Sequence, residues 1–173
     1  LQQIPQLLTL QDRNPHSPTY GCFDRNFWQY RLVDFPTGMA QEFVYPLALA
    51  YSTKLPDNPY FGDEVLCEWI KAGINFAEKS SHSDGSCDDF YPYERAAGAA
   101  AFSLLGCLEA YHLLQLKDAQ LEKFFARRGR WLAEHPESGK LSNHEALIVY
   151  CLYLLSQRFE GSGLAHDYRE RLD

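Results

Sequence analysis

The stretch AAGAAAFSLLGCL at residues 96–108 decides the fold class, because it carries no charged side chain over thirteen consecutive positions. Drawn as a helix, it shows small and apolar residues on every side and no polar face. A helix of this kind has to be covered by other elements. The stretch therefore predicts a central buried helix, which its flanking residues extend to 94–116.

Amphipathic helices are predicted on either side of the central helix, over residues 63–80 and 119–135. Each has a single apolar stripe at helical spacing, with charged residues on the remaining faces. Both helices should therefore turn one side toward solvent. The stripes consist of Val65, Leu66, Trp69, Ile70, Ile74 and Ala77 in the first helix and of Leu121, Phe124, Phe125 and Leu132 in the second.

Two more apolar helices are predicted further out along the chain. Residues 36–54 form the first, and Pro46 is expected to kink it. Residues 142–159 form the second, in which Ser142 and Glu145 have the spacing of an N-cap and its capping-box partner. Like the central helix, both are expected to be buried.

Buried and amphipathic helices thus alternate, at a spacing of roughly fifty residues per pair, with a sixth helix expected from about 164 to 173. This alternation predicts one all-α domain over residues 1–173 that forms half of a six-hairpin α/α toroid, as its N-terminal half. Residues 1–20 are interpreted as a possible extended arm. A half-ring would expose apolar surface, so we expect more chain or self-association to close it.

Polar and aromatic residues gather just before each buried helix. Because the inner helices of a ring of hairpins run in one direction, these residues should meet at one end of the molecule. We expect them to form the mouth of a single site. They are Asp24, Arg25, Trp28, Tyr30, Arg31 and Asp34 before the first helix, Asp84, Asp88, Asp89, Tyr91, Tyr93, Glu94 and Arg95 before or at the start of the second, and Lys140, Asn143 and His144 at the start of the third.

Three segments of the chain, GCFDRNFW at 21–28, DGSCDDFYP at 84–92 with Glu94, and LSNH at 141–144, resemble a known family. It is an uncharacterised bacterial family of α/α-toroid proteins associated with surface polysaccharide gene clusters. More distantly, the segments are similar to the toroid domains of heparinase II/III-like and alginate lyases. The resemblance covers most of the chain and implies a carbohydrate-related function with a polysaccharide or oligosaccharide as partner.

The lyase resemblance implies β-elimination on a uronate-containing glycan. In those lyases an Asn–His pair neutralises the uronate carboxylate and assists proton removal, while a tyrosine protonates the leaving oxygen. The corresponding residues here are Asn143 and His144, with Tyr91 and Tyr93 at the same end. Ser142 stands where the lyases have a second asparagine. In the alternative interpretation, Asn143 belongs to the helix cap and His144 bonds a neighbouring loop.

Carboxylates at the predicted mouth leave two more functions open. Asp89 and Glu94, with Asp24 or Asp34, would provide the acid pair of a glycoside hydrolase. Paired instead with arginines, they would line a noncatalytic module that binds glycan or protein, so the sequence does not decide whether the protein is an enzyme. The expected substrate-binding residues are Asp24, Arg25, Trp28, Arg31, Asp34, Asp89 and Arg95.

Composition narrows the choice of partners. A net charge of −7 argues against nucleic acid as a partner. No zinc-ligand spacing or phosphate-binding loop occurs, and we interpret Asp84–Gly85–Ser86 as a turn and not a calcium loop, so no cofactor or metal is expected.

The cysteines and the apolar segments bear on localisation. Five cysteines without a CxxC pair favour a reduced, cytoplasmic protein. No stretch is long enough to span a membrane. A periplasmic or secreted location remains compatible with a chain that begins at Leu1.

Overall fold

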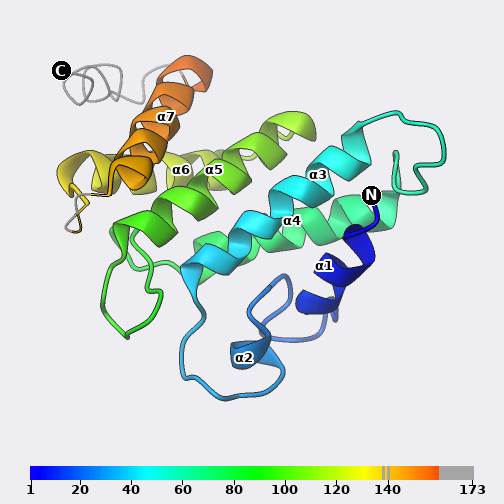
Figure 1. Cartoon of the computed structure of the whole chain (residues 1–173), viewed down its shortest axis with the longest axis horizontal. Helices are drawn as coiled ribbons and strands as arrows, with labels where there is room; N and C mark the ends of the chain where they lie inside the picture. The colour runs from blue at the N-terminus through cyan, green and yellow to red at the C-terminus, as the bar shows by residue number, and fades with distance from the viewer. Residues whose placement is uncertain (138, 140, 160–173) are drawn as a thin grey trace.

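The computed structural model describes residues 1–137, 139 and 141–159, and this part of the chain is helical without any strand. The predicted all-α class is confirmed (Figure 1). The elements are α1 (Ile4–Leu10), α2 (Arg25–Trp28), the 3-10 helix η1 (Gly38–Phe43), α3 (Val44–Ser52), α4 (Glu64–Lys79), α5 (Ala97–Leu113), α6 (Ala119–Glu134) and α7 (Ser142–Arg158).

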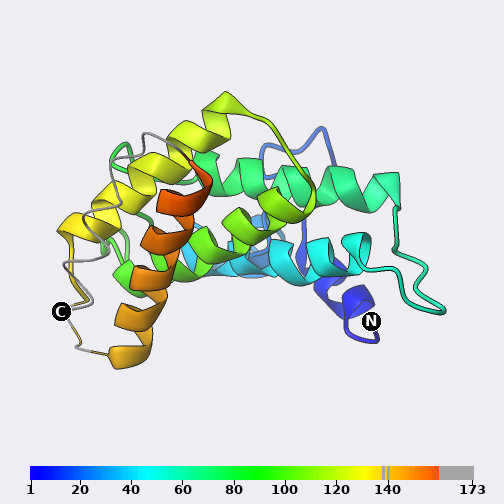
Figure 2. The ribbon, with the colours of Figure 1, turned by 90° about the horizontal axis from the view of Figure 1, so that it is seen from above.

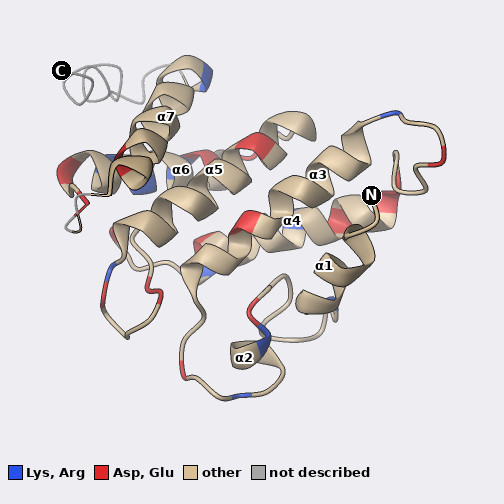
Figure 3. Cartoon of the chain, in the orientation of Figure 1, with Lys and Arg blue, Asp and Glu red and all other residues tan. Residues whose placement is uncertain are grey.

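The helices form two layers, as the view in Figure 2 shows. In one layer α5 lies between α3 and α7, and in the other α4 contacts α6. Charged residues are sparse on α3 and α5 (Figure 3), as their predicted burial requires. No helix among the described residues has the length and apolarity needed to cross a membrane.

Helix α5 is the most enclosed element, and its small residues allow its neighbours to come close. A Cβ on Gly106 would lie 2.9 Å from the Cα of Glu42 in η1, so the two backbones are nearly in contact. Leu104 and Leu108 of the same helix have 0% and 1% of their surface exposed. The alanines and glycines of residues 96–108 therefore serve close packing.

The amphipathic helices α4 and α6 bury the predicted stripes, except that Trp69 is only partly buried and Val65 is exposed. Val65 is 56% exposed, because it falls in the first turn of α4, beside the N-cap, and not over the core. Both helices begin with an aspartate N-cap, Asp63 in α4 and Asp118 in α6, whose side chain accepts hydrogen bonds from two backbone N–H groups. These caps set the starts within one residue of the predicted boundaries.

The predicted helix at 36–54 is wrong in its first part. Residues 38–43 form η1, and the α-helix begins only at Val44. Pro46 lies in the first turn of α3, where a missing N–H leaves no hydrogen bond unmade, so the reason for expecting a kink at this residue does not apply. The close approach of η1 to Gly106 in α5 accompanies the tighter winding.

Three other predicted features differ in the structure. The N-cap of α7 is Leu141, which makes no capping hydrogen bond with its side chain, so Ser142 is not the cap. Glu145 does not act as a capping-box partner but accepts a hydrogen bond from the backbone N–H of Glu137 at 2.8 Å. Residues 94–96 precede α5. Residues 1–20 contain α1, whose Ile4 is buried, and are not extended throughout. The helix predicted at 164–173 and Lys140 of the predicted mouth lie outside the described residues.

Candidate functional site

A cavity of about 510 Å³ opens where the start of α5, the end of α6 and the start of α7 meet. Figure 1 shows that α3, α5 and α7 begin at the same end of the molecule, as predicted for the three polar loops. We call this cavity the α5–α7 pocket. Its lining includes Met39, Asp89, Phe90, Glu94, Arg95, Trp131, His135, Glu137 and His144.

The Glu137–His144 pair is the most organised polar feature of this pocket. Nδ1 of His144 lies 2.9 Å from Oε2 of Glu137, and the two side chains are only 21% and 12% exposed. The imidazole packs edge-on against Phe102 and lies over Gly98, where a Cβ would come within 2.7 Å of Nδ1. Gly98 thus provides the space that His144 occupies.

The charge of Glu137 fixes the orientation of the His144 protons. Hydrogen bonds from the backbone N–H of Gly139, at 3.0 Å, and from His144 lower the pKa of Glu137 below its usual value. An ionised carboxylate only accepts hydrogen bonds, so Nδ1 of His144 carries the proton that it donates. In the neutral imidazole, Nε2 therefore keeps its lone pair, and it makes no hydrogen bond within the described part of the chain.

Glu94 lines the α5–α7 pocket, but one of its oxygens is already engaged. Oε2 accepts hydrogen bonds from the backbone N–H groups of Asp89, Phe90 and Tyr91 at 3.3, 2.8 and 3.2 Å. Asp89 in turn accepts a hydrogen bond from the hydroxyl of Thr37. Both carboxylates thus shape the loop before α5.

Asp88 also holds the loop before α5 in place through hydrogen bonds. It accepts from the backbone N–H groups of Tyr93 and Arg95 and from Nε2 of His82, at 2.8, 3.0 and 2.9 Å. Burial alone would raise its pKa, but these hydrogen bonds outweigh burial and lower it. Tyr93 and Arg95 adopt positive φ angles of 63° and 55°, so Asp88 stabilises a strained backbone.

Arg95 is the cation of the α5–α7 pocket. Its guanidinium forms an ion pair with Asp84, and the two side chains are 50% and 32% exposed. Asp84 also accepts from the N–H and hydroxyl of Ser86, which confirms the predicted turn, and Gly85 has the expected positive φ, 94°. Burial opposes the lowering of the Asp84 pKa, but the bonds from Ser86 and the charge of Arg95 prevail.

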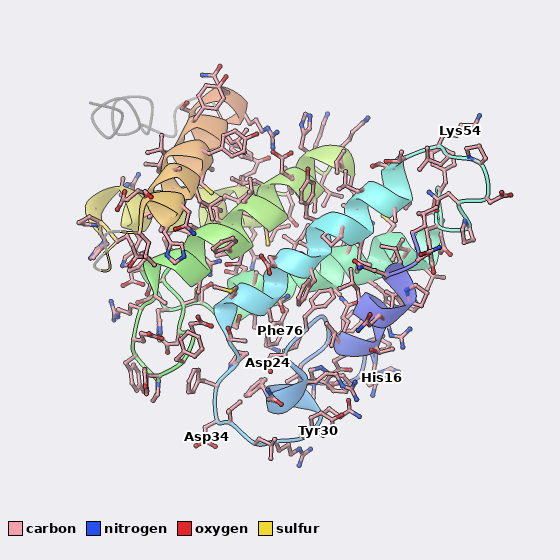
Figure 4. The ribbon with its side chains drawn as sticks, viewed as in Figure 1. His16, Asp24, Tyr30, Asp34, Lys54 and Phe76 are labelled. Atoms are coloured by element: carbon pink, nitrogen blue, oxygen red, sulfur yellow. The ribbon has the colours of Figure 1, made fainter. Side chains whose placement is uncertain are left out.

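The predicted residues of the first loop have structural partners. Asp24 caps α2 and also accepts from the N–H of Thr37 at 3.0 Å, while the indole of Trp28 donates to the carbonyl of Leu10 at 2.8 Å. Arg25 donates to Gln29 and Tyr30. Arg31 and Asp34 are exposed. In Figure 4, Tyr30 and Asp34 lie at the outer edge of this end and Asp24 lies closer to the helices.

Tyr91, Tyr93 and Asn143 are exposed and do not line the α5–α7 pocket. Tyr93 instead stacks on His82, with ring centroids 6.0 Å apart, and lines a second cavity of about 600 Å³ together with Asp34. The structure thus brings together Asp89, Glu94, Arg95 and His144, but it does not bring Asn143 or the two tyrosines to His144.

Sequence reasoning missed Glu137, which lies seven residues before His144 in what reads as an ordinary hairpin loop. A carboxylate close to a histidine across a short loop was the available signal.

No cluster of His, Cys, Asp and Glu in the described ranges is placed to hold a metal ion. The five cysteines are free and buried.

Comparison with protein-family models, with curated proteins and with solved structures found no match to the chain.

Proposed function

We propose that the α5–α7 pocket binds a carbohydrate chain and that His144 acts there as a general base in β-elimination on a uronate-containing glycan. The Glu137–His144 hydrogen bond carries this proposal, because it leaves Nε2 as the basic atom of an imidazole that lines the pocket. In this reaction Nε2 takes the proton next to the uronate carboxylate, a carbon–carbon double bond forms as the glycosidic carbon–oxygen bond breaks, and the leaving oxygen takes a proton from solvent water.

Arg95 would hold the uronate carboxylate. Its present partner, Asp84, forms an ion pair at a half-exposed position, and such pairs are worth about 0–1 kcal/mol. A substrate carboxylate would therefore compete for the guanidinium at little cost. An arginine can bind a carboxylate through two parallel hydrogen bonds, which would orient the sugar ring toward His144.

We propose further that the two layers are half of an α/α toroid. The placement of α5 between α3 and α7, with α4 against α6 outside them, supports this fold. Tyr150 and Tyr153 on α7 are 46% and 42% exposed, on the layer that the next hairpin of a ring would continue.

A noncatalytic glycan-binding module is the second candidate. It is favoured by the internal hydrogen bonds of Asp24, Asp89 and Glu94, which use carboxylate oxygens to hold loops. The same bonds weaken the case for a glycosidase acid pair, which needs two carboxyl groups available to the substrate.

The test is an ultraviolet assay for unsaturated product against a panel of uronate polysaccharides, with reducing ends measured in parallel. We expect His144→Ala to lower the rate by about 10²–10⁴-fold. His112→Ala, at the exposed far end of α5, is the matched control and should retain full activity. Binding without product would favour the noncatalytic module, and the absence of both would refute the carbohydrate proposal.

A further inference from the structure

Large apolar side chains stand exposed at the tips of two loops beside the α5–α7 pocket. Leu32, Phe90, Tyr91 and Tyr93 are 74%, 77%, 70% and 80% exposed. Figure 1 shows both loops projecting beyond the ends of the helices. Together with Tyr30 and Val33, which are 53% and 39% exposed, we call these residues the apolar tips.

The two loops that carry the apolar tips adjoin each other. Val33 from the first loop and Tyr93 from the second line the same cavity of about 600 Å³. The tips therefore belong to one surface, and they are not two unrelated patches of scattered apolar residues.

The backbone under the tips is held in a costly conformation. Five non-glycine residues of the described chain have positive φ, and three of them, Arg31, Tyr93 and Arg95, lie in these two loops. Glu94 and Asp88 bind the backbone of the second loop through five N–H groups. Tyr93 stacks on His82, but Phe90 and Tyr91 remain 77% and 70% exposed. A contact outside the molecule is the use that fits these two rings.

We propose that the apolar tips dock this end of the protein on a lipid bilayer surface. Aliphatic and aromatic side chains both gain from entering the boundary between head groups and acyl chains. A glycan would stack on the aromatic rings but would gain little from Leu32 and Val33. The mixture at the tips thus fits lipid better than sugar.

Arginines beside the tips complement lipid phosphates. Among the described residues, Arg25 donates to the neutral groups of Gln29 and Tyr30 and lies over the Tyr30 ring, and Arg31 makes no ion pair. Nearby Asp89 and Glu94 already accept hydrogen bonds from the protein. Asp34, exposed in the same segment, offsets part of this positive charge, so Arg25 and Arg31 would contribute hydrogen bonds to phosphate more than net attraction.

Docking would turn the mouth of the α5–α7 pocket toward the bilayer, since Phe90 belongs both to the tips and to the pocket lining. The net charge of −7 opposes attraction to anionic lipid. Binding should then depend mainly on apolar contact and change little with salt. This inference stands independently of the proposed elimination chemistry.

The test is flotation of the protein with phosphatidylcholine vesicles at low and high salt. A tip variant combines Leu32→Ser, Phe90→Ser and Tyr91→Ser. A matched control combines Leu55→Ser, Phe61→Ser and Val65→Ser, which are 51%, 47% and 56% exposed around the α3–α4 loop. Far-ultraviolet circular dichroism confirms that both variants are folded.

We expect the wild type and the control to float and the tip variant to lose at least about tenfold in partitioning, because the loss of three apolar side chains removes most of the buried apolar area. Failure of the wild type to float, with or without added phosphatidylserine, would overturn the proposal. Equal loss in both variants would also overturn it, because the apolar tips would then have no special role. Binding of a glycan by the tips without vesicle binding would assign them to sugar stacking instead.

Discussion

Two polar clusters lie along the first half of α5, and they differ in how far solvent reaches them. Around Arg128, which is only 1% exposed, the guanidinium donates to the carbonyl of Gly85 and to the hydroxyls of Ser103 and Ser81 at 2.8, 2.6 and 2.7 Å. At the Glu137–His144 pair, the side chains keep 12% and 21% of their surface, and one imidazole nitrogen makes no hydrogen bond to any described residue.

The polar groups around Arg128 stabilise the fold, whereas the Glu137–His144 pair leaves a polar atom available to a ligand. Arg128 has no carboxylate partner within the described chain, and its charge is met by neutral oxygens and by the ring of Phe124, 4.7 Å from the guanidinium carbon. It connects α6 to α5 and to the loop before α5. We call the buried Arg128 group, with Ser81, Gly85 and Ser103, the closed cluster. It positions the loop before α5, and this loop forms one wall of the α5–α7 pocket, where the Glu137–His144 pair lies.

Removal of the closed cluster should have the largest effect on stability. Arg128→Met would leave the buried acceptors of Ser81, Gly85 and Ser103 without their donor, at a cost of roughly 3–5 kcal/mol in the free energy of unfolding. Urea denaturation measures this change. Arg130→Met, exposed on the same helix, should change stability by less than about 0.5 kcal/mol. Equal effects of the two substitutions would contradict a special role for Arg128.

Gly85→Ala should have the next largest effect. A Cβ at this position, where φ is 94°, would lie 2.7 Å from the backbone nitrogen of Arg128, so the loop and α6 would have to separate. We expect a loss of about 2–3 kcal/mol, seen as a lower urea midpoint. Gly62→Ala shares the positive φ, 68°, but meets no atom within 4 Å and should cost only about 1 kcal/mol. A loss as small at Gly85 would show that the close packing there is unimportant.

Glu137→Gln should have a smaller effect that depends on pH. The folded-state pKa of Glu137 lies below its ordinary value of 4.5, so its stabilising contribution is complete above that pH and disappears as the pH falls through the folded pKa. We expect a difference of about 1 kcal/mol between wild type and variant at neutral pH, shrinking toward pH 3. Thermal unfolding across this range, with Glu134→Gln as an exposed control, measures it. A difference independent of pH would argue against the lowered pKa.

Arg95→Gln should change stability least, by no more than about 0.5 kcal/mol, because its ion pair with Asp84 is half exposed. Its effect should fall on the α5–α7 pocket, as weaker binding of uronate oligosaccharides in calorimetry. Arg127→Gln, which removes the ion pair between Arg127 of α6 and Glu78 of α4, is a control of similar exposure. Unchanged affinity in Arg95→Gln would exclude it from the site.

Long periodic segments allowed most of the fold to be predicted from the sequence. The predicted starts of α4, α6 and α7 lie within one residue of those observed, because caps or apolar stripes mark them. The closed cluster could not be predicted in this way. Arg128 falls among charged neighbours on α6, and only its tertiary contacts with Gly85 and Ser103 reveal that it is buried.

The sequence predicted where the candidate site lies better than it predicted which residues meet there. His144, Glu94 and Arg95 meet in one pocket because their loops share one end of the helical layer. Asn143 points elsewhere for a local reason, since it and His144 are adjacent on a helix and adjacent helical residues do not face the same side. The partnership of His144 with Glu137 depends on how a short loop closes, and no helical periodicity encodes that.

The most direct test of the central claim is the protonation pattern of His144, measured by long-range ¹H–¹⁵N NMR at a pH where the imidazole is neutral. The Glu137 hydrogen bond predicts a proton on Nδ1 and a bare Nε2, and it predicts that Glu137→Gln weakens this preference. A proton on Nε2 in the wild type would contradict the assignment of His144 as a general base directed at the α5–α7 pocket.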